Sequence, residues 1–205
     1  MRSEGRNFME RLEELKKVLL SHSEERERLM AALELRAFPD PNVVRLLAAR
    51  LAEEPSRVVQ EAIVSSLTAM ATEDVVKACA ELLTHADAYV RNAALEMLQA
   101  LDHLSLPVAE ALIEHPDRDL RLFAVRILGE IRRREAIAFL RRVVETDEDI
   151  NVVAEAIEYL GEVGLRREDR EAIMQAAVRL DHPYVRCAAE IALRKMGAGP
   201  DKRKG

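Results

Sequence analysis

Five histidines and two cysteines are the residues of this sequence that could bind a metal or act as nucleophiles. His85 and His115 occupy equivalent places in two similar stretches, "HADAYVRNAALEMLQAL" and "HPDRDLRLFAVRILGEI", that begin thirty residues apart. If these stretches are stacked helices, equivalent positions lie about 8–10 Å apart, whereas a zinc ion lies about 2.0 Å from each nitrogen ligand. We therefore expect no metal site, and we interpret both residues as turn histidines. The other histidines, His22, His103 and His182, also lack ligand spacing.

The remaining residues give little support for catalysis or for a bound cofactor. Cys79 and Cys187 each lie among Ala and Val in a helical pattern, without an obvious histidine partner, and are expected to be small buried hydrophobes. There is no G-x-S-x-G elbow and no glycine-rich loop for a phosphate. The acidic runs Glu53–Glu54 and Asp147–Glu148–Asp149 are interpreted as solvated turns and helix starts. The sequence thus predicts a non-enzyme without a cofactor.

The composition favours a helical, acidic protein. The chain has 37 acidic and 31 basic residues among 205, with the two signs interleaved, which argues against a nucleic-acid partner because such partners attract clustered Lys and Arg. Hydrophobic residues make up 49 %, enough for a sizeable core, and few aromatics and no Trp favour helices over strands. The first twenty residues carry charges throughout, and no run of about 18 apolar residues occurs. We expect a cytoplasmic protein with no membrane partner.

The two stretches quoted above are copies of a longer repeat with the pattern D-x-x-[VL]-R-x-x-A-x-x-x-L. Further copies are "PSRVVQEAIVSSL", "DINVVAEAIEYLG" and "HPYVRCAAEIALRKMG", at a spacing of 30 to 33 residues that is typical of stacked repeats. A small residue recurs where stacked helices would approach most closely. Its positions are Ala62, Ala94, Ala124, Ala156 and Ala189.

Between these copies lie other segments with apolar residues at three- and four-residue steps, so each repeat is expected to be a helical hairpin. Prolines near the starts of helices and side chains that could accept first-turn N–H groups support this interpretation. These residues are Pro41, Pro107, Pro183, Asp40, Thr72 and Ser105. In the second helix of a hairpin, Asp87 and Asp117 are expected to cap the helix and to pair with Arg91 and Arg121. This ladder is predicted to be interrupted at Val59 and Val153.

The Asp, Val-Arg, Ala, Leu-Gly pattern resembles the HEAT repeat, in the short bacterial form also found in phycobilin lyase subunits. The resemblance covers residues 41–196 and extends to residues 7–37 as a degenerate first hairpin. It implies an all-α, right-handed α-solenoid of about six hairpins, similar to armadillo folds, in one domain over residues 1–196. Residues 1–40 would be a capping hairpin, residues 41–196 five repeats and residues 197–205 a disordered tail.

The resemblance implies a scaffold that binds a protein or peptide on the concave face lined by its second helices. The candidate binding residues are Gln60, Asn92, Glu96, Gln99, Leu122, Arg126 and Glu158. Alternatives are a lyase-like or chaperone subunit that holds a prosthetic group for an acceptor protein, and an architectural piece assembled through its ends. A DNA glycosylase of this fold would need a basic, aromatic concave face, and a hydroxylase would need His-Glu steps; the sequence has neither.

One basic stretch leaves the position of the interface open. It comprises Arg132–Arg134, with Arg141 and Arg142 downstream. We interpret it as a solvated edge, and the alternative is a docking patch for phosphate or an acidic protein.

Overall fold

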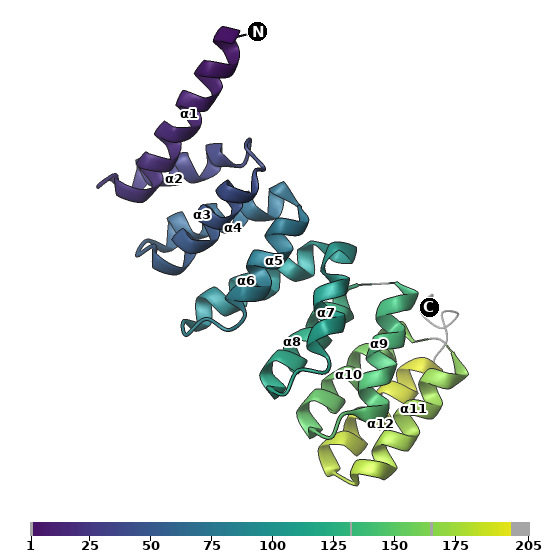
Figure 1. Ribbon diagram of the computed structural model, residues 1–205. Helices are drawn as coiled ribbons and strands as arrows, with labels where there is room; N and C mark the ends of the chain where they lie inside the picture. The colour runs from purple at the N-terminus through teal and green to yellow at the C-terminus, as the bar shows by residue number, and fades with distance from the viewer. Residues whose placement is uncertain (1, 132, 165, 198–205) are drawn as a thin grey trace, which may run out of the picture. The chain divides into compact units, whose positions relative to one another are not determined.

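The computed structural model describes residues 2–131, 133–164 and 166–197, with side chains from Phe8 onward. Within these residues the chain forms twelve α-helices, one short 3-10 helix and no strand, which confirms the predicted all-α solenoid class (Figure 1). Gly197 is the last residue of the final helix. The predicted disordered tail, apart from Gly197, lies outside the described residues.

Consecutive helices pair into six hairpins, each with a first and a second helix. The bounds are α1 Arg2–Ser21 and α2 Glu25–Leu35; α3 Pro41–Glu53 and α4 Arg57–Met70; α5 Glu73–Leu82 and α6 Ala88–Ala100; α7 Leu106–Leu112 and α8 Arg118–Glu130; α9 Arg134–Thr146 and α10 Ile150–Val163; α11 Arg167–Leu180 and α12 Pro183–Gly197. The 3-10 helix Asp102–Ser105 precedes α7. The first hairpin, predicted to be degenerate, is therefore a complete helix pair.

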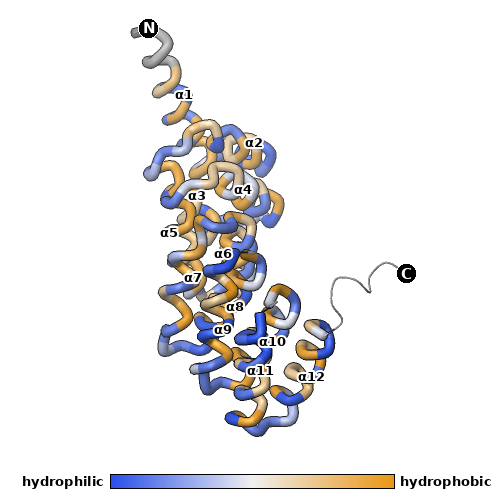
Figure 2. The backbone as a smooth tube through the Cα atoms, turned by 90° about the vertical axis from the view of Figure 1, so that its right-hand side faces the viewer, coloured by the Kyte–Doolittle hydropathy of each residue, from blue (hydrophilic) through white to orange (hydrophobic). Residues whose placement is uncertain are grey.

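The chain consists of two compact units, residues 1–104 and 105–205, with three hairpins each. In the first unit α2 packs on α4 and α4 on α6; in the second unit α8 packs on α10 and α10 on α12. Apolar and polar residues alternate along the helices, as expected when each helix buries one stripe (Figure 2). The single domain over residues 1–196 stays a prediction.

Short side chains let the second helices of a unit pack closely. The five repeated alanines, Ala62 to Ala189, are all buried, as expected for this position. At Gly161 an added Cβ would lie 2.8 Å from the backbone Cα of Ala192, so α10 and α12 meet almost backbone to backbone. A larger residue at such points would force the hairpins apart.

Most of the residues predicted to cap helix N-termini do so in the structure. Asp40, Asp87 and Asp117 each accept the backbone N–H two residues on, and Thr72 accepts that of Val75. Pro41, Pro107 and Pro183 all lie in first turns, as predicted. The prediction for Ser105 was wrong, because its side chain makes no capping hydrogen bond.

An arginine four residues after the cap position is bonded to the backbone of the turn in two hairpins. Arg91 donates to the carbonyls of His85 and Ala86, at 2.7 Å each, and Arg121 donates to those of His115 and Pro116. No hydrogen bond or ion pair joins these arginines to the aspartates four residues earlier, which cap their own helices as predicted; Asp117 acts on Arg121 through its charge alone. We call the residues that make this contact turn arginines.

Arg28 is a third turn arginine, which sequence analysis missed, and it shows a second role. It donates to the carbonyls of His22 and Ser23 and also to both carboxylate oxygens of Glu54, 26 residues later, in the turn of the next hairpin. Arg121 reaches Asp147, again 26 residues later, at 2.7 Å. One guanidinium thus fixes its own turn and the following one.

Glu54 and Asp147 are therefore not solvated, contrary to expectation. Glu54 is 3 % exposed and is also bonded to Arg50 and to the backbone N–H of Ser56. Burial by itself would raise the pKa of Glu54, but the hydrogen bonds from Arg28, Ser56 and Arg50 together lower it below its ordinary value. The side chain of Asp147 is only 6 % exposed.

The second hairpin lacks a turn arginine, and the reason differs from the one expected. Its second helix is capped by Ser56, so the equivalent position is Gln60 rather than Val59. Gln60 is 6 % exposed and donates to the carbonyl of Leu51, so it holds its own turn with a neutral side chain. Val153, the other predicted interruption, is buried.

We expect Glu54→Gln to lower the free energy of unfolding by about 3–5 kcal/mol, because it leaves the buried guanidinium of Arg28 without a counter-charge. Urea denaturation monitored by circular dichroism measures the loss. The matched control is the exposed Glu53→Gln, which should change the midpoint little. Equal midpoints for both variants would contradict the role of Glu54.

Acid unfolding provides an independent measurement of the same interaction. The pKa of Glu54 is lowered in the folded state. Its contribution to the free energy of unfolding is therefore fully present above the pKa that it has in the unfolded chain, and is lost as pH falls through its pKa in the folded chain. The native chain should lose stability below about pH 4.5 more steeply than Glu54→Gln. Parallel curves for the two proteins would contradict this assignment.

We expect Ala124→Leu to destabilise the second unit by about 1–3 kcal/mol, since Ala124 is fully buried in α8 and the site has no room for three more carbons. Ala111→Leu makes the same chemical change at an exposed position of α7 and should be nearly silent. Thermal denaturation of the two variants compares them directly.

Candidate functional site

The histidines are parts of turns. His22, His85 and His115 each accept a backbone N–H two residues on through Nδ1, at 3.0–3.2 Å. His182 accepts from Tyr184 in the same way at 3.3 Å. No group of three or more His, Cys, Asp or Glu side chains within the described residues could hold a metal ion. The turn role predicted for His85 and His115 follows from their contacts, and the lack of a metal stays a prediction.

The two cysteines differ. Cys79 is fully buried, as predicted, and burial raises the pKa of its thiol to about 12, so it remains a protonated thiol at neutral pH. Cys187 is exposed on α12, so its predicted burial was wrong.

A groove of about 330 Å³ lies on the second helices of the second unit. It is lined by residues from the first turns of α8, α10 and α12 and from the next turn of α8 and α10. We call it the second-helix groove, and its lining residues are Arg118, Asp119, Leu122, Arg126, Asp149, Asn151, Val152, Glu155 and Tyr184. The helices that form it are those held together by Ala124, Ala156 and Gly161.

The spacing of residues on α8 explains which of its side chains line the groove. Arg118, Leu122 and Arg126 are four residues apart and therefore share one face of the helix. The inner stripe of the same helix, Leu120, Ala124 and Leu128, is buried in the core. The groove residues are thus the positions that remain after the core has been assigned.

Both signs of charge are present in the groove, and most of the charges are paired. Arg126 donates to Glu155 from Nε at 2.7 Å and from Nη2 at 3.3 Å. The pKa of Arg126 is raised, foremost by this hydrogen bond to Glu155. Arg118 lies 3.4 Å from Asp119 and 3.7 Å from Asp149, which also caps α10. A ligand of this groove would exchange these ion pairs for its own.

Two side chains in the groove supply contact area that is less polar than these ion pairs. Tyr184 at the start of α12 is 47 % exposed, and Leu122, which lines the same groove from α8, is half-buried. Tyr and Arg are enriched in protein interfaces, where their large surfaces are removed from water. The groove can therefore offer an aromatic face, an aliphatic side chain and a guanidinium to one ligand.

The seven predicted binding residues are distributed as follows. Leu122 and Arg126 line the groove, and Glu158 is exposed on α10 outside the lining. In the first unit, Asn92 and Glu96 are exposed on α6, and Gln99 is half-buried. Gln60 is buried and bonded to Leu51, so we leave it out of any binding surface.

Sequence analysis missed five charged or aromatic members of the groove: Arg118, Asp119, Asp149, Glu155 and Tyr184. Asp149 was identified only as a helix start, a role that it also has. A signal for Arg118 was present, since it stands one turn before Leu122 on the same face. Glu155 was hidden because its pairing with Arg126 spans 29 residues.

In the part of the chain that the structure describes, none of the helices combines the length and the apolar character needed to cross a lipid bilayer.

Comparison with solved structures places several helical-repeat proteins beside this chain. Human deoxyhypusine hydroxylase, solved with glycerol, is 19 % identical, with 92 % of this chain and 74 % of that one covered and a TM-score of 0.49. A HEAT-like repeats protein from the archaeon Thermococcus onnurineus NA1 is 12 % identical, with 91 % and 87 % covered and a TM-score of 0.49. The complex of CpcE and CpcF of phycocyanin lyase from Nostoc sp. PCC7120 gives 18 % identity, 91 % and 81 % coverage and a TM-score of 0.38. Comparison with curated protein sequences gave no match.

The family assignment comes from the sequence itself. The profile of the HEAT repeats matches residues 12–99 and again residues 105–194, which together are well over half of the chain. The two matches coincide with the two compact units and with the six helical hairpins described above. The repeated alanines and the turn arginines are the physical counterparts of this match. The chain belongs to the HEAT-repeat family.

Proposed function

We propose that this protein is a non-catalytic binding module that holds a segment of a protein partner in the second-helix groove. The observation that carries the proposal is the composition of that groove, which is lined by Tyr184 from α12 and by Leu122 and Arg126 from α8. The HEAT-repeat fold is suited to this task because stacked hairpins present long open surfaces.

The size of the groove supports an extended peptide rather than a large flat surface. Its volume of about 330 Å³ is at the lower end of the range found for ligand pockets, enough for a few side chains. The paired charges fit a partner with both acidic and basic residues, because such a partner replaces the Arg126–Glu155 pair and leaves neither charge unpaired.

The exposed residues of α6, Asn92 and Glu96, extend the proposal to the first unit. They occupy the second helix of the third hairpin, as Leu122 and Arg126 occupy that of the fourth. We propose them as a separate contact surface for the same class of partner, with Gln99 at its edge. Glu158 extends the surface of the second unit along α10.

Replacing Arg126 by Glu together with Tyr184 by Ala should weaken partner binding at least tenfold, because both changes remove large interface side chains and one reverses a charge. The partner is first captured from native lysate by crosslinking, and its affinity for each purified variant is then measured by calorimetry.

The matched control carries Arg142→Glu and Met174→Ala, which reverse the same charge and truncate another exposed side chain on the first helices α9 and α11. Both residues are exposed there. Equal melting temperatures exclude a folding defect in either variant. A larger loss of affinity in the control would place the interface on the first helices and overturn the proposal.

A further inference from the structure

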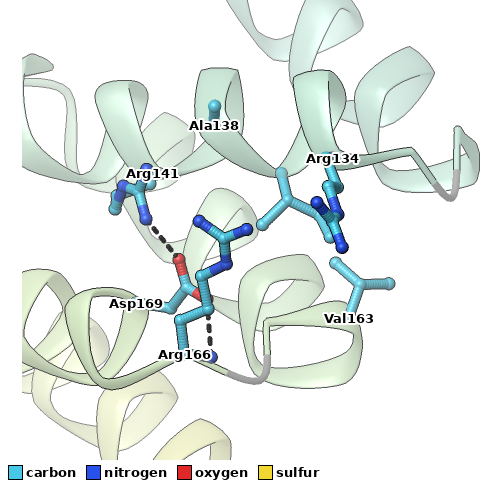
Figure 3. Close-up of a pocket in the computed structure, with 7 residues that line it drawn as sticks. Arg134, Ala138, Arg141, Val163, Arg166 and Asp169 are labelled. Carbon is cyan, nitrogen blue, oxygen red and sulfur yellow. Dashed lines mark hydrogen bonds and ion pairs between the residues drawn. The ribbon is translucent and has the colours of Figure 1, made fainter.

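A second cavity in the second unit lies on the side of the first helices, away from the groove residues. It has a volume of about 320 Å³ and is formed by the starts of α9 and α11 and the end of α10. We call it the arginine pocket, and its lining residues are Arg134, Ile137, Ala138, Arg141, Val163, Arg166 and Asp169 (Figure 3).

The floor of the arginine pocket is a buried carboxylate with fixed partners. Asp169 is fully buried, and its Oδ1 lies 3.0 Å from Nη1 of Arg141. Its other oxygen accepts the backbone N–H of Arg166, also at 3.0 Å. Arg141 additionally contacts Glu168 at 3.0 Å, so its charge is already matched by two carboxylates. Arg141 therefore serves to hold the pocket together.

The other two arginines are available to a ligand. Among the described residues no carboxylate lies within ion-pair distance of Arg134, and the nearest to Arg166 is Glu168 at 4.0 Å. Both side chains are exposed. Figure 3 shows Arg134 extending from α9 toward Val163 and Arg166 extending from the start of α11 toward α9. Both residues line the same pocket, one from each helix.

The walls between these guanidinium groups are apolar. Ile137 and Ala138 belong to the second turn of α9, and Val163 is the last residue of α10. A ligand that places an anionic group between the two arginines would have carbon atoms against these side chains. Such contact is favourable because it removes methylene groups from water.

The charge balance selects a monoanion. The three arginines of the pocket have two carboxylates as ion-pair partners, Asp169 in the lining and Glu168 outside it, which leaves an excess of one positive charge. A carboxylate neutralises this excess, whereas the second charge of a phosphate dianion would be repelled by the two acidic side chains. Guanidinium groups also match the planar carboxylate in two-point hydrogen bonds.

We propose that the arginine pocket binds an aliphatic carboxylate, with the carboxylate between Arg134 and Arg166 and the alkyl chain against Ile137 and Val163. The carboxylate can belong to a free organic acid or to a glutamate side chain of a bound protein. This site is separate from the second-helix groove, and the proposal does not rest on the function proposed for that groove.

The test is a titration of the full chain with sodium butyrate, followed by the Nε–Hε resonances of its arginines in NMR spectra. The resonances of Arg134 and Arg166 should shift with a saturable dependence on butyrate, and inorganic phosphate at equal ionic strength should shift them less. Saturation should require at least tenfold more butyrate in the variant Arg134→Gln, Arg166→Gln. Phosphate binding equal to or tighter than butyrate binding would overturn the proposal.

The control variant Arg142→Gln, Arg167→Gln removes the same charge from neighbouring exposed positions outside the pocket. It should bind butyrate like the native chain. If it loses binding as much as the pocket variant does, the response reflects overall charge, and the site does not exist.

A second arm compares butyrate with N-acetylglutamate methylamide, which carries the same carboxylate on a peptide unit. Tighter binding of the peptide unit identifies a partner's glutamate as the source, and tighter binding of butyrate identifies a free acid. Either result supports a carboxylate site. Binding of neither compound contradicts it.

Discussion

The close approach of the second helices is the constraint on which the rest of this structure depends. A single hairpin has an apolar face that its own two helices cannot cover, and it buries that face only against the next hairpin. The distance of approach is set by the buried alanines and by Gly161 against Ala192. Because those positions are fixed by packing, the remaining positions on the same helices are left to face outward. The second-helix groove is a direct result of this division.

Two of the three turn arginines link one hairpin to the next. Arg28 and Arg121 each join two turns through one planar side chain, which bonds to backbone carbonyls on one side and to a buried carboxylate on the other. A buried charge pair of this kind contributes little net stability compared with apolar packing. Its contribution is geometric, since a guanidinium directs its donors in a fixed plane. Packing supplies the energy, and the arginines define the orientation.

The sequence was sufficient to predict the helices, their pairing and the buried alanines, because these features follow from local periodicity and from a repeat seen several times. It was insufficient for the ion pairs between hairpins. Glu54 looks like any acidic residue in a turn, and only the position of Arg28 in three dimensions makes it buried. The same limit applies to the binding residues. Leu122 and Arg126 were predicted because they lie on the face of α8 that the core residues leave exposed. Tyr184 and Arg166 could not be assigned to cavities, because these cavities arise only when helices stack.

Two turn arginines, Arg28 and Arg121, have an acidic partner 26 residues later, and this has a consequence for how such chains can be recombined. A hairpin whose turn arginine reaches beyond its own turn needs a successor whose turn carries Glu or Asp, as with Arg28 and Glu54. A hairpin with a neutral residue at that place, such as Gln60, is followed by a turn with His85 and makes no such demand. Hairpins of this type therefore fall into two compatibility classes. Transplanting one between repeat proteins requires matching two residues, one on each side of the junction.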